Sequence, residues 1–151
     1  MKKIFLIMGF CILISACDYK PLYKNSKINN FYYEVVETKG DRDVNKYIIK
    51  NLERKSSNNK STKYKIKLDT QYTKTILAKD SFGSPTDFEL RATSIFNISS
   101  LIDNYTFNLE EKFSYKNLNE NYEQTNYESS IKKNLASQIT EKLIIKIASL
   151  K

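Results

Sequence analysis

The side chains that most enzymes use for catalysis are scarce in this chain of 151 residues. The sequence contains no His, two Cys and three Gly. Zinc sites built from His and Cys, and nucleophilic centres of the Ser-His-Asp or Cys-His kind, are therefore excluded. Glycine-rich phosphate-binding loops cannot be drawn from three scattered glycines. We expect a protein that is not an enzyme, with no catalytic residue and no metal site.

Cys17 follows a segment with the three parts of a secretory signal peptide. The chain begins with two lysines, runs apolar over residues 4–14 and then has two small residues before Cys17. A basic start, an apolar stretch of about 7–15 residues and a small-residue cleavage site define such a peptide. The run is too short for a transmembrane helix, which needs about 20 residues. Residues 1–16 are therefore predicted to be a signal peptide.

The residues around the predicted cleavage site are more specific. The run Leu13-Ile14-Ser15-Ala16-Cys17 resembles the bacterial lipobox, in which a peptidase cuts before a cysteine whose sulfur carries diacylglycerol. The resemblance implies cleavage between Ala16 and Cys17 and a mature chain that begins at a lipidated Cys17. Buried lipid contributes about 0.8 kcal/mol per CH₂, so a multiply acylated terminus anchors the domain to a membrane. Apart from this covalent lipid we expect no cofactor.

The formal net charge of +8 suits a phosphate-bearing partner and first suggests nucleic acid. Loss of residues 1–16 removes Lys2 and Lys3, so the charge falls from +8 to +6. It also removes Cys11, which leaves a mature domain with no free thiol and no disulfide. Because an exported, lipid-anchored protein works where there is no nucleic acid, we predict no nucleic-acid binding.

The mature chain divides into a tether and a domain. Residues 17–30 comprise the lipidated cysteine and a mainly polar stretch, and residues 31–151 are predicted to form one domain. Residues 31–37 are aromatic and β-branched, as in a strand. Gly40 and Asp41 end this strand.

The middle of the domain is predicted to be a helix and three strands. Apolar residues recur at helical spacing over residues 44–52, with Asp41 or Asp43 placed to cap the helix. Alternation of apolar and polar residues then predicts strands over residues 64–78, 88–98 and 105–115. Turn-forming clusters separate these strands. Tyrosines that share the apolar alternation are predicted to lie in the core: Tyr64, Tyr72, Tyr105 and Tyr115.

A long amphipathic helix is predicted to close the domain. Residues 125–128, Thr-Asn-Tyr-Glu, match the capping box and predict its start. An interfacial membrane helix is the competing interpretation, but the sheet needs a helical cover. The predicted fold class is α+β, a two-layer sandwich with two helices on one face of a mainly antiparallel four-stranded sheet, in the order β-α-β-β-β-α. The apolar stripe of this closing helix consists of Ile131, Leu135, Ile139, Leu143, Ile147 and Leu150.

The start of the mature chain carries a family resemblance. Cys17-Asp18-Tyr19-Lys20-Pro21-Leu22-Tyr23 looks like the Cys-Gly-aromatic-x-Pro-Leu-Tyr opening of the LPS-assembly lipoprotein family LptE, and the alphaproteobacterial members are closest in style. The order of elements, the length and the closing helix are similar as well. Asp18 departs from the usual Gly of the family.

The resemblance implies a definite function without catalysis. LptE lies partly inside the large LptD β-barrel of the outer membrane as a plug, helps that barrel assemble and takes part in placing lipopolysaccharide in the outer leaflet. It also binds lipopolysaccharide. The implied location is the periplasmic side of the outer membrane, with an LptD-like barrel and lipopolysaccharide as partners.

The resemblance also implies candidate contact residues. In the family, basic residues near the turn between the second and third strands and in the loop before the last helix contact lipopolysaccharide. Lys74, Lys79 and Arg91 lie on or beside the first connection here, and Lys116 opens the second. Lysine and arginine give charge-assisted hydrogen bonds to phosphate. Solvated lysines are the competing interpretation in so lysine-rich a chain.

The tether supplies a second set of candidates. No periodic core explains its apolar and aromatic residues, which are therefore candidates for contact with the barrel: Tyr19, Pro21, Leu22 and Tyr23. Asp18 supports an alternative function, because an Asp after the lipidated cysteine resembles the inner-membrane retention signal of enteric bacteria. The protein would then be an envelope lipoprotein held at the inner membrane as a periplasmic binding or accessory module.

Overall fold

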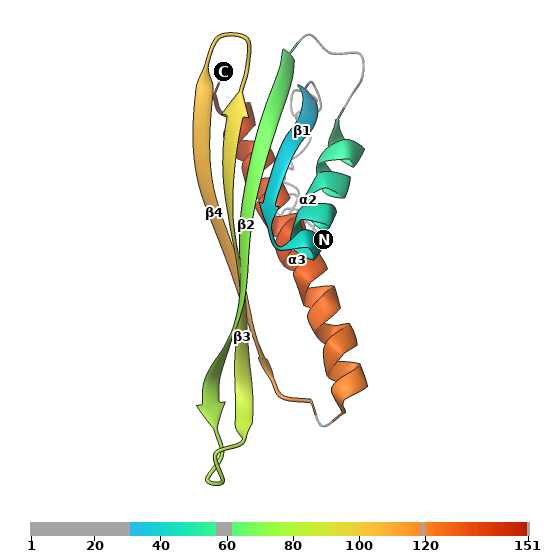
Figure 1. The fold of residues 1–151 in the computed structure, drawn as a ribbon, viewed down its shortest axis with the longest axis vertical. Helices are drawn as coiled ribbons and strands as arrows, with labels where there is room; N and C mark the ends of the chain where they lie inside the picture. The colour runs from blue at the N-terminus through green and yellow to red at the C-terminus, as the bar shows by residue number, and fades with distance from the viewer. Residues whose placement is uncertain (1–30, 57–61, 119, 151) are drawn as a thin grey trace, which may run out of the picture.

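The structure, a computed structural model, describes residues 31–56, 62–118 and 120–150. Four strands form one sheet in the order β1-β2-β3-β4, and two helices lie together on one side of it (Figure 1). The predicted α+β two-layer fold and its order of elements are confirmed. The signal peptide, Cys17 and the tether lie outside the described residues. The elements are β1 (Phe31–Gly40), α2 (Arg42–Lys55), β2 (Thr62–Lys79), β3 (Pro85–Ser99), β4 (Asn104–Lys116) and α3 (Asn121–Ala148).

The sheet is mixed, because β1 pairs with β2 in parallel and the other pairs are antiparallel. Two parallel neighbours need a crossover that returns the chain to the starting edge. α2 provides it, since its 14 residues run back beside β1 over about 21 Å at 1.5 Å per residue. Two side-chain contacts tie this helix to the strand. The Tyr33 N–H donates to Ser56 Oγ over 3.1 Å, and Asn45 Nδ2 donates to the Lys39 carbonyl over 2.7 Å.

Gly40 makes the sharp exit from β1 possible. Its φ is +81°, in the left-handed region that favours glycine. A Cβ placed there would lie 1.9 Å from the Thr70 carbonyl oxygen on β2. That same oxygen accepts the Asp41 N–H over 2.8 Å, so the turn lies directly against the neighbouring strand.

Asp41 is the predicted cap that the helix uses. Its Oδ1 accepts the Val44 N–H over 2.9 Å, which satisfies one of the unpaired amides at the start of α2. Its Oδ2 lies 3.3 Å from Lys132 Nζ on α3. One carboxylate therefore links the β1–α2 turn to the second helix.

One face of the sheet and the helices enclose the hydrophobic core. Strand alternation directs Ile66 and Leu68 of β2 and Leu90 and Phe96 of β3 toward the helices, and all four are buried. Tyr64 and Tyr115 are also buried, and Tyr72 and Tyr105 are partly buried against this core, as predicted. The buried stripe of α3 comprises Ile131, Leu135, Ile139, Leu143 and Ile147.

The start of α3 differs from the prediction. The helix begins at Asn121, four residues before the predicted start at Thr125. Thr125 Oγ1 donates to the Asn121 carbonyl within the helix, and Glu128 contacts the sheet in place of closing a capping box. Tertiary contacts with β2 and β4 outweigh the local cap here. Phe113 shares the apolar alternation of β4 but lies on this edge strand and is 40% exposed.

Leu150, the last residue of the predicted stripe, lies two residues beyond the end of α3 and is only partly buried. Within the described residues, neither helix combines the length and apolarity that crossing a bilayer requires.

Gly40 and Gly83, the glycines of positive φ among the described residues, give a matched test of the β1–α2 turn. Gly83 has a φ of +85° with open space around its Cβ position. We expect Gly83→Ala to lower the free energy of unfolding by about 1–2 kcal/mol, the strain of the left-handed backbone alone. Gly40→Ala should lower the free energy of unfolding by more than about 3 kcal/mol, because the added methyl group would clash with the Thr70 carbonyl as well. Chemical denaturation measures both, and equal costs would contradict the close approach to Thr70.

The α3 stripe gives a second stability test. Truncation of Leu135 or Ile139 to Ala should lower the free energy of unfolding by about 2–5 kcal/mol, because each leaves a cavity under the helix. Ile145 on the same helix is 47% exposed, and Ile145→Ala should change stability by less than about 0.5 kcal/mol. Urea titrations compare the three variants. A loss below about 0.5 kcal/mol at the two stripe positions would contradict their place in the core.

Candidate functional site

The face of the sheet turned away from α2 and α3, the open face, is lined mainly by polar side chains. Cross-strand pairs link them: Lys67 Nζ lies 3.0 Å from Glu37 Oε2, and Thr106 Oγ1 donates to Asn97 Oδ1 over 2.9 Å. Ile95 is an apolar exception and is 39% exposed. Exposed pairs of this kind contribute about 0–1 kcal/mol to stability, so their arrangement matters chiefly for what the face can contact.

Arg91 lies on the open face in the middle of an ion-pair group. Its guanidinium donates to Glu89 over 2.7 Å and to Glu110 on β4 over 3.0 Å. The hydrogen bond from Arg91 outweighs the desolvation of Glu89 and holds the pKa of that carboxyl below its usual range. The charge of this candidate residue is thus already taken up by two carboxylates.

Lys74 lies on the opposite, helix-facing side of the same hairpin. Its Nζ is 2.6 Å from Glu128 Oε1 on α3 and 4.1 Å from the centre of the Phe88 ring. Glu128 also accepts hydrogen bonds from Tyr115 and Gln124. Burial opposes ionisation of Glu128, but these donors prevail and lower its pKa. Lys74 therefore joins the sheet to the helix and is not free at the turn.

Lys79 and Lys116 lie at the same end of the sheet. Lys79 is the last residue of β2, and Lys116 is the last residue of β4. They flank Asp87 of β3, which pairs in register with Ala78 on one side and with Lys116 on the other. Both lysines are exposed and lack an ion pair with any described residue. Two strand spacings, about 10 Å, separate the outer strands here.

The β2–β3 turn at this end presents a large apolar side chain. Asp80 accepts the N–H groups of Phe82 and Ser84 through its carboxylate, and Gly83 supplies the positive φ. The turn is thus internally bonded while Phe82 is 91% exposed. We call Phe82, Lys79 and Lys116 the hairpin tip. Exposed cations beside an exposed aromatic ring suit a ligand with both phosphate and apolar parts.

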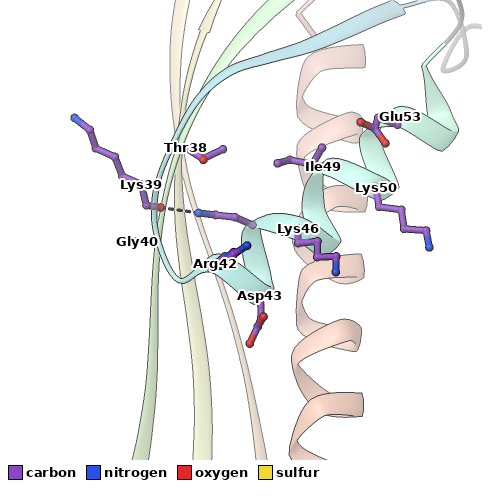
Figure 2. Close-up of a pocket in the computed structure, with 10 residues that line it drawn as sticks. Thr38, Lys39, Gly40, Arg42, Asp43, Lys46, Ile49, Lys50 and Glu53 are labelled. Carbon is purple, nitrogen blue, oxygen red and sulfur yellow. Dashed lines mark hydrogen bonds between the residues drawn. The ribbon is translucent and has the colours of Figure 1, made fainter.

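A groove of about 990 Å³ runs between the end of β1 and the outer side of α2. Figure 2 shows Thr38 and Ile49 pointing toward each other across it. Arg42, Lys46 and Lys50 line it at spacings of four residues, so they share one side of the helix. None of the three has an ion pair within the described residues. The groove is therefore a second cationic surface, and helical spacing in the sequence was the signal that could have revealed it.

The sequence did not predict that large apolar residues would be exposed in the turns. Turn clusters were predicted around residues 81–85 and 99–104, but not that Phe82, Leu101 and Ile102 would be exposed there. A large apolar residue inside a turn cluster was the available signal. The candidates Tyr19, Pro21, Leu22 and Tyr23, like Ala16 and Cys17, lie outside the described residues. Among the residues that the structure does describe, no three potential metal ligands lie together.

Comparison with protein-family models finds no match, and comparison with curated proteins finds none either. Solved structures do match. Rare lipoprotein B from Shewanella oneidensis has a TM-score of 0.59 and 12% identity, covering 80% of this chain and 94% of that one. A lipoprotein from Caulobacter crescentus has a TM-score of 0.53 and 11% identity, covering 83% and 92%. At such identities the likeness shows a shared fold.

Lipoprotein B from Nitrosomonas europaea is a third similar structure. Its TM-score is 0.51 at 11% identity, and the match covers 83% of this chain and 88% of that one. The high coverage of the similar chains means that the described domain corresponds to nearly all of each structure. The fold of this chain is therefore one that lipoproteins also have.

The Lys74–Glu128 contact predicts a pH-dependent stability. Glu128→Gln should lower the free energy of unfolding at neutral pH by about 1–2 kcal/mol, since it removes a charged acceptor of three hydrogen bonds. A carboxyl group whose pKa is lower in the folded protein than in the unfolded chain stabilises the fold at pH values above its unfolded pKa. That stabilisation is lost as the pH falls through the folded pKa. The deficit of the variant should therefore shrink as the pH falls below the ordinary pKa of a glutamate side chain, about 4.3, because Glu128 has a lowered pKa in the folded protein.

The matched control for this prediction is Glu110→Gln on the open face, where the carboxylate is 44% exposed. That change should alter stability by less than about 0.5 kcal/mol. Urea unfolding at neutral pH and in acid measures the free energy of unfolding of the wild type and of both variants. A deficit of Glu128→Gln that persists unchanged in acid would contradict the assignment.

Proposed function

We propose that this protein is an outer-membrane lipoprotein of the LptE type. It occupies the lumen of an LptD-like β-barrel, helps the barrel assemble and takes part in the insertion of lipopolysaccharide into the outer leaflet. The observation that carries the proposal is the polar, uncovered face of a long sheet on a fold that lipoproteins share. The lipid on Cys17 attaches the protein to the membrane from the periplasmic side, and no catalysis is involved.

The open face suits the inside of a barrel. Side chains that line the lumen of a transmembrane barrel are polar, whereas those on its outer surface are apolar. A plug in that lumen needs hydrogen-bonding groups on its own surface. The Lys67–Glu37 and Arg91–Glu110 pairs and free polar residues such as Asn108 provide them. Because the helices cover the other face, such a plug keeps its core closed to water.

The hairpin tip suits lipopolysaccharide. Lys79 and Lys116 offer cations to the phosphates of lipid A, and Phe82 offers an apolar surface to its acyl chains. Lys74 and Arg91 belong to the same proposal as residues that shape the hairpin, since each already has carboxylate partners. In the tether, Tyr19, Pro21, Leu22 and Tyr23 are proposed contacts with the barrel wall.

Fractionation of native membranes tests the location and the partner together. The protein should be found in the outer-membrane fraction and should co-purify with a large β-barrel protein after solubilisation in detergent. Recovery in the inner membrane without a barrel would favour the alternative, a lipoprotein retained by Asp18 as a periplasmic accessory module. Asp18→Gly separates the two further, because it should move the protein between membranes only if the retention signal operates.

Charge reversal at the hairpin tip tests the glycolipid contact. Lys79→Asp with Lys116→Asp should weaken lipopolysaccharide binding by roughly tenfold or more, the loss expected when two charge-assisted contacts of about 1 kcal/mol each are removed. Lys46→Asp with Lys50→Asp makes the same charge change at the groove and should leave binding within about twofold. Equal binding by the tip variant and the wild type, or equal losses by both variants, would contradict the tip as the site.

A further inference from the structure

The β3–β4 turn lies at the end of the sheet opposite the hairpin tip. Its four residues, Ser100 to Asp103, are held by hydrogen bonds among themselves, one of them from Ser100 Oγ to the Asp103 carbonyl over 3.2 Å. The Ser100 N–H donates to the Asp103 carbonyl over 2.9 Å, and Ser100 Oγ accepts the N–H groups of Ile102 and Asp103. The turn is thus internally satisfied, and its two outer residues are fixed in place.

Those outer residues are Leu101 and Ile102, which are 94% and 89% exposed. Turn positions are usually filled by Gly, Asn, Asp, Ser or Pro, each for a backbone reason. Neither aliphatic side chain is required by the turn, and neither packs on the core. Two adjacent aliphatic residues that stand out from a hydrogen-bonded turn form a small apolar surface, which only a partner outside the domain can cover.

The chain from the lipid enters the domain at this same end. Phe31 pairs with Thr62 at the start of β2, three residues from the point where Lys65 pairs with Ser99 beside the turn. Figure 1 shows the start of β1 and the β3–β4 connection at one end of the sheet and the β2–β3 turn at the other. The turn is therefore close to the place where the tether begins.

Lengths decide which end can meet the membrane. Residues 18–30 span at most about 45 Å when fully extended. The 18 residues of β2 separate its ends by about 55–60 Å. An upright domain that touched the bilayer with Phe82 would place Phe31 beyond the reach of the tether. The end that carries Leu101 and Ile102 has no such restriction.

The side chains near this turn suit a membrane surface. Tyr105 lies directly behind it with its hydroxyl 3.0 Å from Asp103 Oδ2, and its ring stacks on Phe107. Lys146 of α3 lies over Phe107 at 5.6 Å, and Lys65 is exposed on the open face beside Ser99. Tyrosines at the headgroup level and lysines near anionic lipid both favour such a surface, with Asp103 the one opposing charge on the turn.

We propose that Leu101 and Ile102 insert into the membrane to which Cys17 is anchored, as a second attachment point. This inference rests on the lipid anchor of the proposed function but not on the barrel. A single flexible tether leaves the orientation of a domain free, whereas a second contact at a rigid turn fixes it. The β3–β4 end of the sheet then lies against the leaflet that holds the lipid, and the hairpin tip lies at the far end of the sheet.

A single tryptophan tests the insertion, because the chain contains none. The full-length lipidated protein is reconstituted into vesicles of phosphatidylethanolamine and phosphatidylglycerol, with and without brominated acyl chains. In the Leu101→Trp protein we expect blue-shifted emission and strong quenching by the brominated lipid. Phe82→Trp is the matched control, since that position is equally exposed at the other end, and its emission should be neither shifted nor quenched.

The outcomes separate this inference from the proposed function. If the wild type binds to the vesicles and the Cys17→Ala variant does not, the lipid on Cys17 is the anchor. Retention together with a Leu101→Trp emission equal to that of Phe82→Trp would overturn the insertion and leave the anchor intact. Failure of the vesicles to retain the wild type would overturn the anchor and the inference with it. Ile102→Trp repeats the measurement at the neighbouring position, so that one poorly folded variant does not decide the result.

Discussion

Burial of one face of the sheet is the constraint on which the rest of the structure depends. α3 lays Leu135, Ile139 and Leu143 on that face, and α2 covers the remainder beside β1. Because both helices cover the same face of the single sheet, the open face stays in contact with solvent or a partner. The Asp41–Lys132 and Lys74–Glu128 contacts fix the position of α3 on the sheet. A polar open face and two protruding turns follow from this arrangement.

Regular periodicity made the fold predictable from the sequence. Alternation over β2, β3 and β4 and the four-residue repeat of α3 depend on local spacing, which the sequence displays directly. The start of α3 was not predictable, because Glu128 is held by Lys74 and Tyr115, which are distant in the sequence. The same reason applies to the candidate site. Lys74 and Arg91 were placed with the turn by proximity in the chain. The hairpin is long enough to keep both away from the turn, and strand alternation puts them on opposite faces, where each pairs with a carboxylate.

The two ends of the sheet have different chemistry, and this difference gives the domain a direction. Phe82, Lys79 and Lys116 gather an aromatic ring and two cations at one end. Leu101 and Ile102 stand at the other, where the chain from Cys17 enters. A lipoprotein that reaches from one leaflet toward a glycolipid needs such a direction, and a rigid sheet about 60 Å long maintains it. In the proposed function, the charge that first suggested nucleic acid serves to bind lipid phosphates.

The proposed role as a plug depends most directly on where the open face lies in the cell. A photocrosslinking amino acid at Asn108, exposed on the open face of β4, measures this in intact cells. We predict a crosslink to a large outer-membrane β-barrel protein, stronger than that from the same amino acid at Lys133, an exposed residue of α3. No crosslink to a barrel from Asn108, in cells where the protein is folded and membrane-bound, would contradict the role as a plug.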